Sequence, residues 1–161
     1  MNRAYLLIGG NEGDRLDYLQ QARDYINVFL GEIVNHSHIY ETSAWGKTDQ
    51  PDFLNQALLI NTLLEADTLM RNILMIERKM GRARQEKFGA RTIDIDILFF
   101  NEKIINSPDL KIPHPEIQNR RFVLVPMNEI AGKFVHPSLN KKIETLLAEC
   151  ADNLDVKKMG I

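Results

Sequence analysis

The sequence lacks the features that mark several large classes of protein. Cys150 is its only cysteine, so no internal disulfide can form, which favours a reducing compartment and a small buried side chain at this position. The net charge of −2 gives no general attraction for nucleic acid or for an anionic membrane. The N-terminal apolar run, residues 4–8, is too short for a signal peptide or a membrane span. We therefore expect a cytoplasmic monomer that acts on small molecules.

The composition predicts one soluble globular domain over residues 1–161. Apolar residues make up 44% and charged residues 26% of the chain, which is long enough to bury a core without disulfides or structural metals. No linker, low-complexity tract or second domain interrupts it.

Hydrophobic periodicity predicts an α+β fold. We expect strands over residues 4–8, 33–40, 53–64 and 93–100, and helices between Asp14 and Gly31, between Asp67 and Gly81, and over residues 141–150. Asp14 and Asp67 are the expected N-caps of the first two helices. We expect irregular structure around Pro126. This order predicts a ferredoxin-like β-α-β-β-α-β sheet with helices on its faces.

The most informative strand is the last of the four. Apolar and acidic residues alternate from Ile93 to Ile97, so Asp94 and Asp96 point to the same face, with their Cα atoms about 7 Å apart. At an effective dielectric near 20, two carboxylates about 6 Å apart repel by about 3 kcal/mol, and a divalent cation reverses that term. Because the neighbouring chain offers oxygen ligands, the expected metal is Mg²⁺. We expect Leu98 and Phe100 to continue the same face.

A basic segment precedes this strand. Between Glu77 and Arg91 the sequence holds six cationic residues and two acids. Arginines beside a metal-binding carboxylate pair suit phosphoryl-group transfer, which depends on positioning and charge neutralisation. The alternative is a solvated loop whose arginines pair with the two aspartates.

Other motifs leave two interpretations open. Residues 9–14 are a glycine-containing loop that lacks the Walker and dinucleotide signatures. His36 and His38 fit an exposed polar face better than a metal site.

Phe53 and Asn55 share a strand face, where they suit either a flat nitrogenous ring or plain surface. His114 lies between Pro113 and Pro115, either as a ligand contact or as part of a simple loop.

Several segments together resemble the 6-hydroxymethyl-7,8-dihydropterin pyrophosphokinase family, nearly from end to end. The most specific is residues 87–98 (KFGARTIDIDIL), and four others support it: residues 50–55, 81–84, 112–115 and 119–122. The resemblance implies transfer of the terminal pyrophosphoryl group of ATP to the pterin hydroxymethyl oxygen in folate biosynthesis.

The resemblance also implies site residues. Two Mg²⁺ ions would bind Asp94 and Asp96 and bridge the triphosphate. The residues implied in catalysis are Arg82, Arg91, Asp94 and Asp96. Those implied in ATP binding are Leu74, Glu77, Arg84, Lys87, Phe88, Arg91, Ile97, His114 and Arg120. Those implied in pterin binding are Thr42, Ser43, Ala44, Trp45, Phe53, Asn55, Asp94 and Phe122.

Some positions depart from the family pattern. They are Ser43 and Ala44 in place of two prolines, Trp45 in place of a smaller residue, Phe88 in place of tryptophan, Leu74 in place of a polar residue, and Asp109 and Lys111 in place of arginine and threonine. Two rival functions remain: a nucleotide-sugar glycosyltransferase, which also uses Asp-x-Asp, and a non-catalytic ferredoxin-like module that binds RNA or an effector.

Overall fold

The computed structural model describes residues 1–43, 51–81 and 92–160, and this part of the chain forms one main antiparallel sheet. Its strand order is β5-β1-β4-β3-β8, with β2 also paired to β4. The strands are β1 Asn2–Gly10, β2 Glu32–His36, β3 Tyr40–Thr42, β4 Phe53–Thr62, β5 Asp94–Phe100 and β8 Val156–Lys158. A separate two-stranded sheet joins β6 Ile105–Asn106 to β7 Lys111–Ile112.

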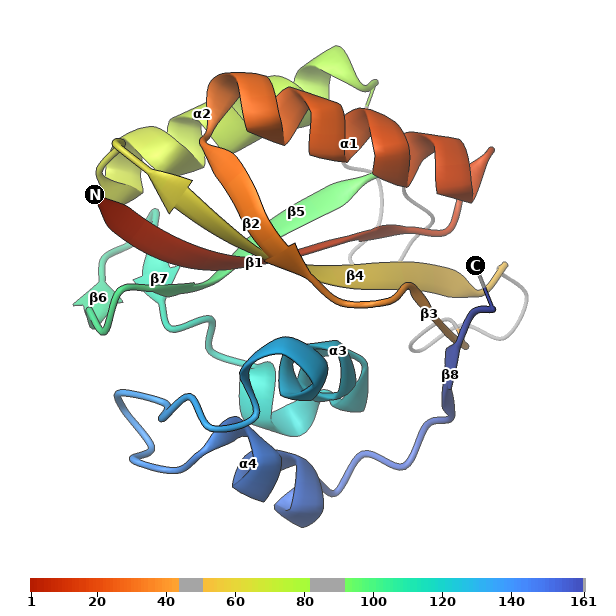
Figure 1. Cartoon of the computed structure of the whole chain (residues 1–161), viewed down its shortest axis with the longest axis vertical. Coiled ribbons are helices and arrows are strands. Elements are labelled where there is room, and N and C mark those ends of the chain that lie inside the picture. Colours follow the sequence, from red (N-terminus) through yellow and green to blue (C-terminus); the bar gives the residue numbers. More distant parts are fainter. Residues whose placement is uncertain (44–50, 82–91, 161) are drawn as a thin grey trace.

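Helices cover both faces of the main sheet (Figure 1). On one face lie α1 Arg15–Phe29 and α2 Ala66–Lys79, over a core that includes Leu6, Ile8 and Ile60. On the other lie η1 Ile117–Asn119, α3 Arg121–Ala131 and α4 Ile143–Glu149. The order β1-α1-β2-β4-α2-β5 confirms the predicted ferredoxin-like fold.

The helix starts show which capping predictions hold. Asp14 is the N-cap of α1, and its carboxylate accepts a hydrogen bond from the backbone N–H of Asp17 at 3.1 Å. The prediction that Asp67 caps α2 is wrong. Glu65 is the N-cap, and Asp67 lies in the first turn, where a negative charge stabilises the positive end of the helix dipole.

The predicted strand over residues 33–40 is divided into β2 and β3. The Ser37 hydroxyl donates to the carbonyl of His38 and accepts from the N–H of Ala57, so a side chain takes part in the pairing between strands. The Asn35 side chain accepts from the N–H of His36, and the register shifts between Ile33 and Asn35. Such local bonds compete with a regular ladder, and they end the alternation that the sequence predicts.

The prediction that Phe100 shares a face with the two aspartates is also wrong. Tyr5 pairs with Phe99 and Leu6 pairs with Ile97, so Leu98 is an extra residue in β5. This bulge places both Leu98 and Phe99 in the core under α3, and Phe100 in the core under α1 and α2.

Two elements near the C-terminus were not expected. Helix α3 contains Pro126, which removes one intrahelical hydrogen bond. Its Val123, Leu124 and Met127 are buried at helical spacing against the sheet, and this packing offsets the cost of the proline. Strand β8 pairs with β3 at the sheet edge, whereas the expected short C-terminal helix is confirmed as α4.

Glu77 joins α2 to the strand that carries the aspartates. It is 4% exposed, and its carboxylate accepts a hydrogen bond from the backbone N–H of Ile95 at 2.8 Å. Ile95 lies between Asp94 and Asp96 on β5, which pairs with β1 and is the last strand of the main sheet in the described part of the chain. In the described part of the chain, no helix has both the length and the apolar character needed to cross a membrane.

We predict that Glu77→Ala lowers the free energy of unfolding by about 1–3 kcal/mol, because the buried N–H of Ile95 loses its acceptor. Glu77→Gln keeps an acceptor oxygen and should lose less. Urea unfolding measures both, with Glu102→Ala, an exposed acid on the turn after β5, as the matched control. Equal stability of the Glu77→Ala variant and the control would contradict this role.

The buried imidazole of His136 makes the stability of the fold depend on pH. His136 is 4% exposed, its Nδ1 accepts from the N–H groups of Ser138 and Leu139, and burial lowers its pKa from the ordinary 6.5. Protonation therefore favours the unfolded chain, and the stability that His136 contributes is present above pH 6.5 and lost as the pH falls below it.

Between about pH 7.5 and about pH 5.5 the wild type should lose more free energy of unfolding than a His136→Asn variant. The exposed His36 provides the control substitution, His36→Asn, which should follow the wild type. Parallel stability curves for the wild type and His136→Asn would show that burial of this imidazole does not set the pH dependence.

Candidate active site

Three neighbouring strands align the predicted site residues in two rows. Gly9 of β1 pairs with Asp94 of β5 on one side and with Asn55 of β4 on the other. Two residues along, Leu7 pairs with Asp96 and with Ala57. Because paired residues share a face, Asp94, Asp96 and Asn55 lie on the face of the sheet that α3 covers.

Gly9 leaves room for the side chain of Asn55. A Cβ atom at this position would lie 2.1 Å from Oδ1 of Asn55 and 2.6 Å from the carbonyl oxygen of Leu54. Any larger residue would therefore displace Asn55, whose side chain is only 6% exposed. The missing side chain leaves a flat stretch of backbone between a carboxylate and a primary amide.

The short strand β3 extends this face. Thr42 pairs with Phe53, and Tyr40 pairs with Asn55. Thr42 is 3% exposed, and its hydroxyl has no hydrogen-bond partner among the described residues. Ser43, the last described residue of this segment, is exposed, and Phe53 is half-buried. The sheet therefore brings Thr42, Phe53 and Asn55, three of the predicted pterin contacts, to one place.

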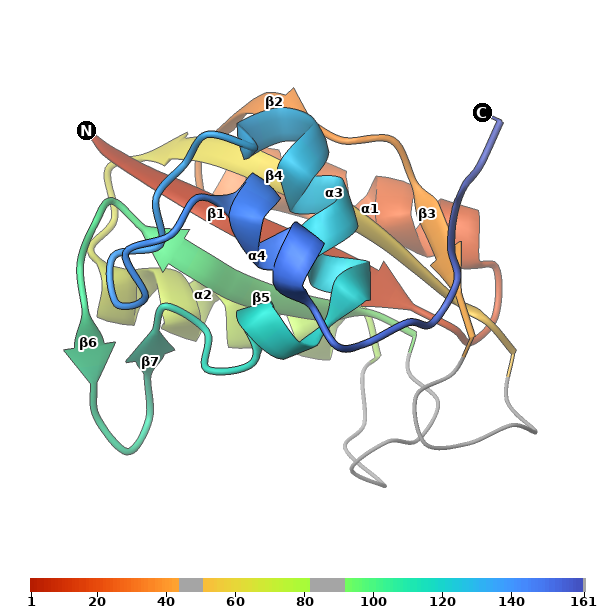
Figure 2. The same cartoon turned by 90° about the horizontal axis from the view of Figure 1, so that it is seen from below.

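Helix α3 lies across the same face of the sheet (Figure 2), and two more predicted residues, Arg120 and Phe122, lie at its start. It contacts β4 and β3, and it begins with Arg120 as its N-cap. The guanidinium carbon of Arg120 lies 5.8 Å from the ring centroid of Phe122, which suits a cation–π contact. Phe122 is partly buried against the core that contains Leu7 and Ala57.

His114 lies close enough to Arg120 and Asp94 for their charges to act on it. Burial lowers the pKa of His114 and the Arg120 guanidinium lowers it further, whereas Asp94 and Glu116 oppose the shift. Its Nδ1 accepts from the backbone N–H of Glu116 at 3.1 Å. The neutral ring therefore carries its proton on Nε2, where it is a hydrogen-bond donor.

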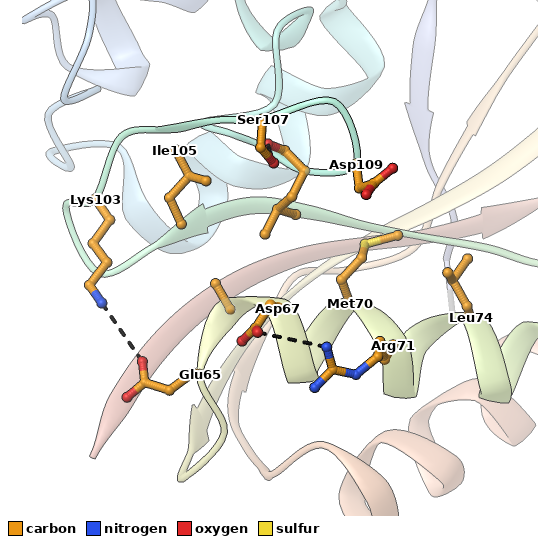
Figure 3. A pocket seen from close by; sticks show the side chains of 11 residues that line it. Glu65, Asp67, Met70, Arg71, Leu74, Lys103, Ile105, Ser107 and Asp109 are labelled. Atoms are coloured by element: carbon orange, nitrogen blue, oxygen red, sulfur yellow. Dashed lines mark hydrogen bonds and ion pairs between the residues drawn. The ribbon is translucent and has the colours of Figure 1, made fainter.

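The remaining described ATP candidates lie on the opposite side of β5. Ile97 is 5% exposed in the core beneath α1 and α2, and Glu77 binds the backbone of Ile95. Leu74 lines a cavity of about 740 Å³ between α2 and residues 103–110 (Figure 3). Asp109, one of the departures from the family pattern, lines the same cavity.

Seven of the predicted site residues lie outside the described residues. They are Ala44, Trp45, Arg82, Arg84, Lys87, Phe88 and Arg91. Their assigned roles therefore stay predictions, and so does the alternative in which arginines of this segment pair with the aspartates.

The donors on the described face fit a hard cation that arrives with phosphate. In the described part of the chain, no group of three or more His, Cys, Asp and Glu residues forms a metal site. Two carboxylates on one face match Mg²⁺, which keeps waters and binds proteins through one or two carboxylates together with substrate phosphates.

Sequence reasoning missed Arg15 and Asn11, which bind the end of β3 and the residues just before β4. Arg15 donates from Nη1 to Glu41 and to the carbonyl of Asp52, both at 2.8 Å. Asn11 is 1% exposed and donates to the carbonyl of Pro51 at 3.0 Å. Their partners are at least 26 residues away in sequence, so no local pattern indicates these contacts.

The rival RNA-binding module expects exposed aromatic residues on an open sheet. Helices α3 and α4 cover the second face of this sheet, and Phe99 beneath them is 1% exposed. In the described part of the chain, the strongly exposed large hydrophobic residues are all aliphatic. This arrangement does not fit an open stacking surface.

Known proteins support the family that the motifs indicate. The sequence model described as 7,8-dihydro-6-hydroxymethylpterin-pyrophosphokinase matches residues 5–132. Two relatives are named 2-amino-4-hydroxy-6-hydroxymethyldihydropteridine pyrophosphokinase. The Aquifex aeolicus protein is 38% identical over 92% of this chain and 92% of its own length, and the Bacillus subtilis protein is 42% identical over 80% and 78%.

The fold agrees with a solved structure. The Plasmodium falciparum HPPK-DHPS structure with SDX-DHP superposes with a TM-score of 0.76 at 19% identity. It covers 92% of this chain, and this chain spans 43% of that longer protein. The motifs, the extent of the match and the identities give one conclusion: the chain belongs to the 7,8-dihydro-6-hydroxymethylpterin-pyrophosphokinase family.

Proposed function

We propose that this chain catalyses ATP-dependent pyrophosphoryl transfer to the hydroxymethyl group of 6-hydroxymethyl-7,8-dihydropterin in folate biosynthesis, releasing AMP. Family membership and the names of its relatives support this activity. The structural observation that carries it is the alignment of Asp94 and Asn55 on either side of Gly9, with Asp96 on the same face.

The pterin binds between β4 and α3. Asn55 has both a donor and an acceptor in its amide, and this pair matches the edge of a pterin ring. Phe53 and Phe122 supply aromatic faces for stacking, and the absence of a side chain at Gly9 leaves room for the Asn55 amide beside it. Thr42 and the segment from Ser43 to Trp45 complete the ring contacts.

ATP binds with its triphosphate over the aspartates. Asp94 and Asp96 would hold two Mg²⁺ ions, which would supply neutralisation of the phosphate charge. His114 donates from Nε2 to a phosphate oxygen, and Arg120 grips another with its planar fork. We assign Arg82 and Arg91 to the transferring group. We assign the remaining ATP contacts to Leu74, Glu77, Arg84, Lys87, Phe88, Arg91 and Ile97.

The reaction is an in-line displacement. The pterin hydroxymethyl oxygen forms a bond to the β-phosphorus, and the bond from that phosphorus to the oxygen of AMP breaks. The hydroxyl proton leaves to solvent. Because the transition state is loose, positioning and charge neutralisation supply most of the rate, and no strong general base is required.

We also propose a domain organisation, an oligomeric state, a location and a class of partners for the enzyme. Residues 1–161 act as one domain and as a cytoplasmic monomer, with small molecules as the only partners. The net charge of −2 supports this part of the proposal, because it gives no electrostatic attraction for the phosphate backbone of nucleic acid.

The direct test is product analysis. Incubation with ATP, Mg²⁺ and 6-hydroxymethyl-7,8-dihydropterin should yield AMP and the pterin pyrophosphate in equal amounts, as resolved by anion-exchange chromatography. Omitting the pterin is the control, and it should yield no AMP if the site excludes water from ATP. Formation of ADP, or transfer of a sugar from a nucleotide sugar, would refute the proposed reaction.

The metal assignment predicts that Asp96→Asn lowers kcat by at least about a hundredfold, because the site loses a negative charge that binds the cation. The fold should survive, as circular dichroism and urea unfolding would show. Asp24→Asn, on the exposed face of α1, is the matched control. Full activity of the Asp96→Asn variant in Mg²⁺ would refute the assignment.

A further inference from the structure

The first turn of α3 donates a hydrogen bond to a residue far along the chain. Arg120 is the N-cap of α3 but makes no side-chain capping bond. Asp152 takes that role from 31 residues away: one carboxylate oxygen accepts from the backbone N–H of Arg121 at 3.0 Å. The other oxygen accepts from the N–H of Leu154 at 3.0 Å, which fixes the carboxylate in place.

The capped residue lies between two substrate contacts of the proposed site. Arg121 separates Arg120, assigned to ATP, from Phe122, assigned to the pterin. The chain that follows Asp152 continues into β8, where Val156 pairs with Thr42 (Figure 1). The C-terminal segment therefore contacts α3 on one side of the pterin site and β3 on the other.

The far half of α3 has its own attachment to β3. The Glu129 carboxylate accepts from the Tyr40 hydroxyl at 2.7 Å and from the backbone N–H of His38 at 3.0 Å. Burial raises the pKa of Tyr40 to about 12, together with its hydrogen bond to Glu129 and the charge of that carboxylate. Because Glu129 holds this end of the helix, losing Asp152 should loosen only the first turn.

We propose that Asp152 is a positioning residue for pterin binding, which fixes the first turn of α3 so that Phe122 faces the ring. This inference rests on the proposed function. Asp152 and β8 lie beyond residues 5–132, the part that the family sequence model matches. The carboxylate acts on Phe122 through the helix backbone and does not touch the substrate.

The expected effect follows from helix capping. A carboxylate at a helix N-terminus satisfies an N–H group that has no partner within the helix, and it interacts favourably with the helix dipole. Without the Asp152 carboxylate, the first turn of α3 is ordered for only part of the time. The apparent affinity for the pterin is then the intrinsic affinity multiplied by the ordered fraction. The usual strength of such an interaction corresponds to about a two- to fivefold change.

The experiment compares the wild type with Asp152→Ala, Asp152→Asn and the control Asp155→Ala. Asp155 is an acid of the same segment, and its side chain is 74% exposed. The KM for the pterin should rise about two- to fivefold in Asp152→Ala and less in Asp152→Asn, which keeps an acceptor oxygen. The kcat should stay within about twofold, because the phosphate contacts remain.

Amide hydrogen exchange gives a second readout that does not depend on activity. In Asp152→Ala the amides of Arg121 and Phe122 should exchange faster, while Leu124 and Met127 keep wild-type rates. The KM for ATP should change less than that for the pterin, because the N–H of Arg120 is bonded separately to the carbonyl of Ile117.

The outcomes separate this inference from the proposed function. A wild type that forms no AMP refutes the function, whatever the variants do. An active wild type with an unchanged pterin KM in Asp152→Ala, or an equal rise in Asp155→Ala, overturns the inference even if the melting temperature falls. Should Asp152→Ala not fold, unchanged pterin KM and unchanged Arg121 exchange in Asp152→Asn overturn it.

Discussion

The register of β5 and β4 against β1 is the constraint on which the candidate site depends. It places Asp94, Gly9 and Asn55 in one row, and Asp96, Leu7 and Ala57 in the next. A slip of one residue in either pairing would send the acids or the amide to the other face of the sheet, into an apolar core. The buried side chains of the strands exclude that slip, since Ile8, Ile95 and Leu58 are each at most 2% exposed.

The surrounding elements stabilise the strand that carries the two aspartates. Glu77 fixes the backbone between the two aspartates from α2, and α3 covers the face they occupy. Contacts from Asp152 and Glu129 hold α3 at its two ends. The fold therefore keeps two carboxylates close together and uses hydrogen bonds elsewhere to do so.

Local patterns in the sequence account for the outline of the fold and for the shared face of the aspartates. Alternation from Ile93 to Ile97 is enough to place Asp94 and Asp96 together, and helical spacing is enough to identify α1 and α2. The alternation predicts the wrong face where a strand contains an extra residue, as β5 does at Leu98. Local patterns also fail at Pro126, because burial of α3 outweighs the low helix propensity of proline.

The contacts that assemble the site are not visible in local patterns. Gly9 reads as a loop glycine, yet its lack of a side chain matters because Asn55 lies beside it, 46 residues later. Asp152 and Glu129 read as ordinary surface acids, since their partners are 31 and 89 residues away. Family resemblance supplies roles for such residues, but only the tertiary structure explains which backbone groups they hold.

The central claim is that Asp94 and Asp96 hold divalent cations that carry the triphosphate. Mn²⁺ binding in the presence of α,β-methylene-ATP, followed by electron paramagnetic resonance, tests it most directly, because this analogue cannot release AMP. The account predicts two bound Mn²⁺ ions per wild-type chain, with loss of tight binding in both Asp94→Asn and Asp96→Asn. Unchanged Mn²⁺ stoichiometry and affinity in these two variants would contradict it.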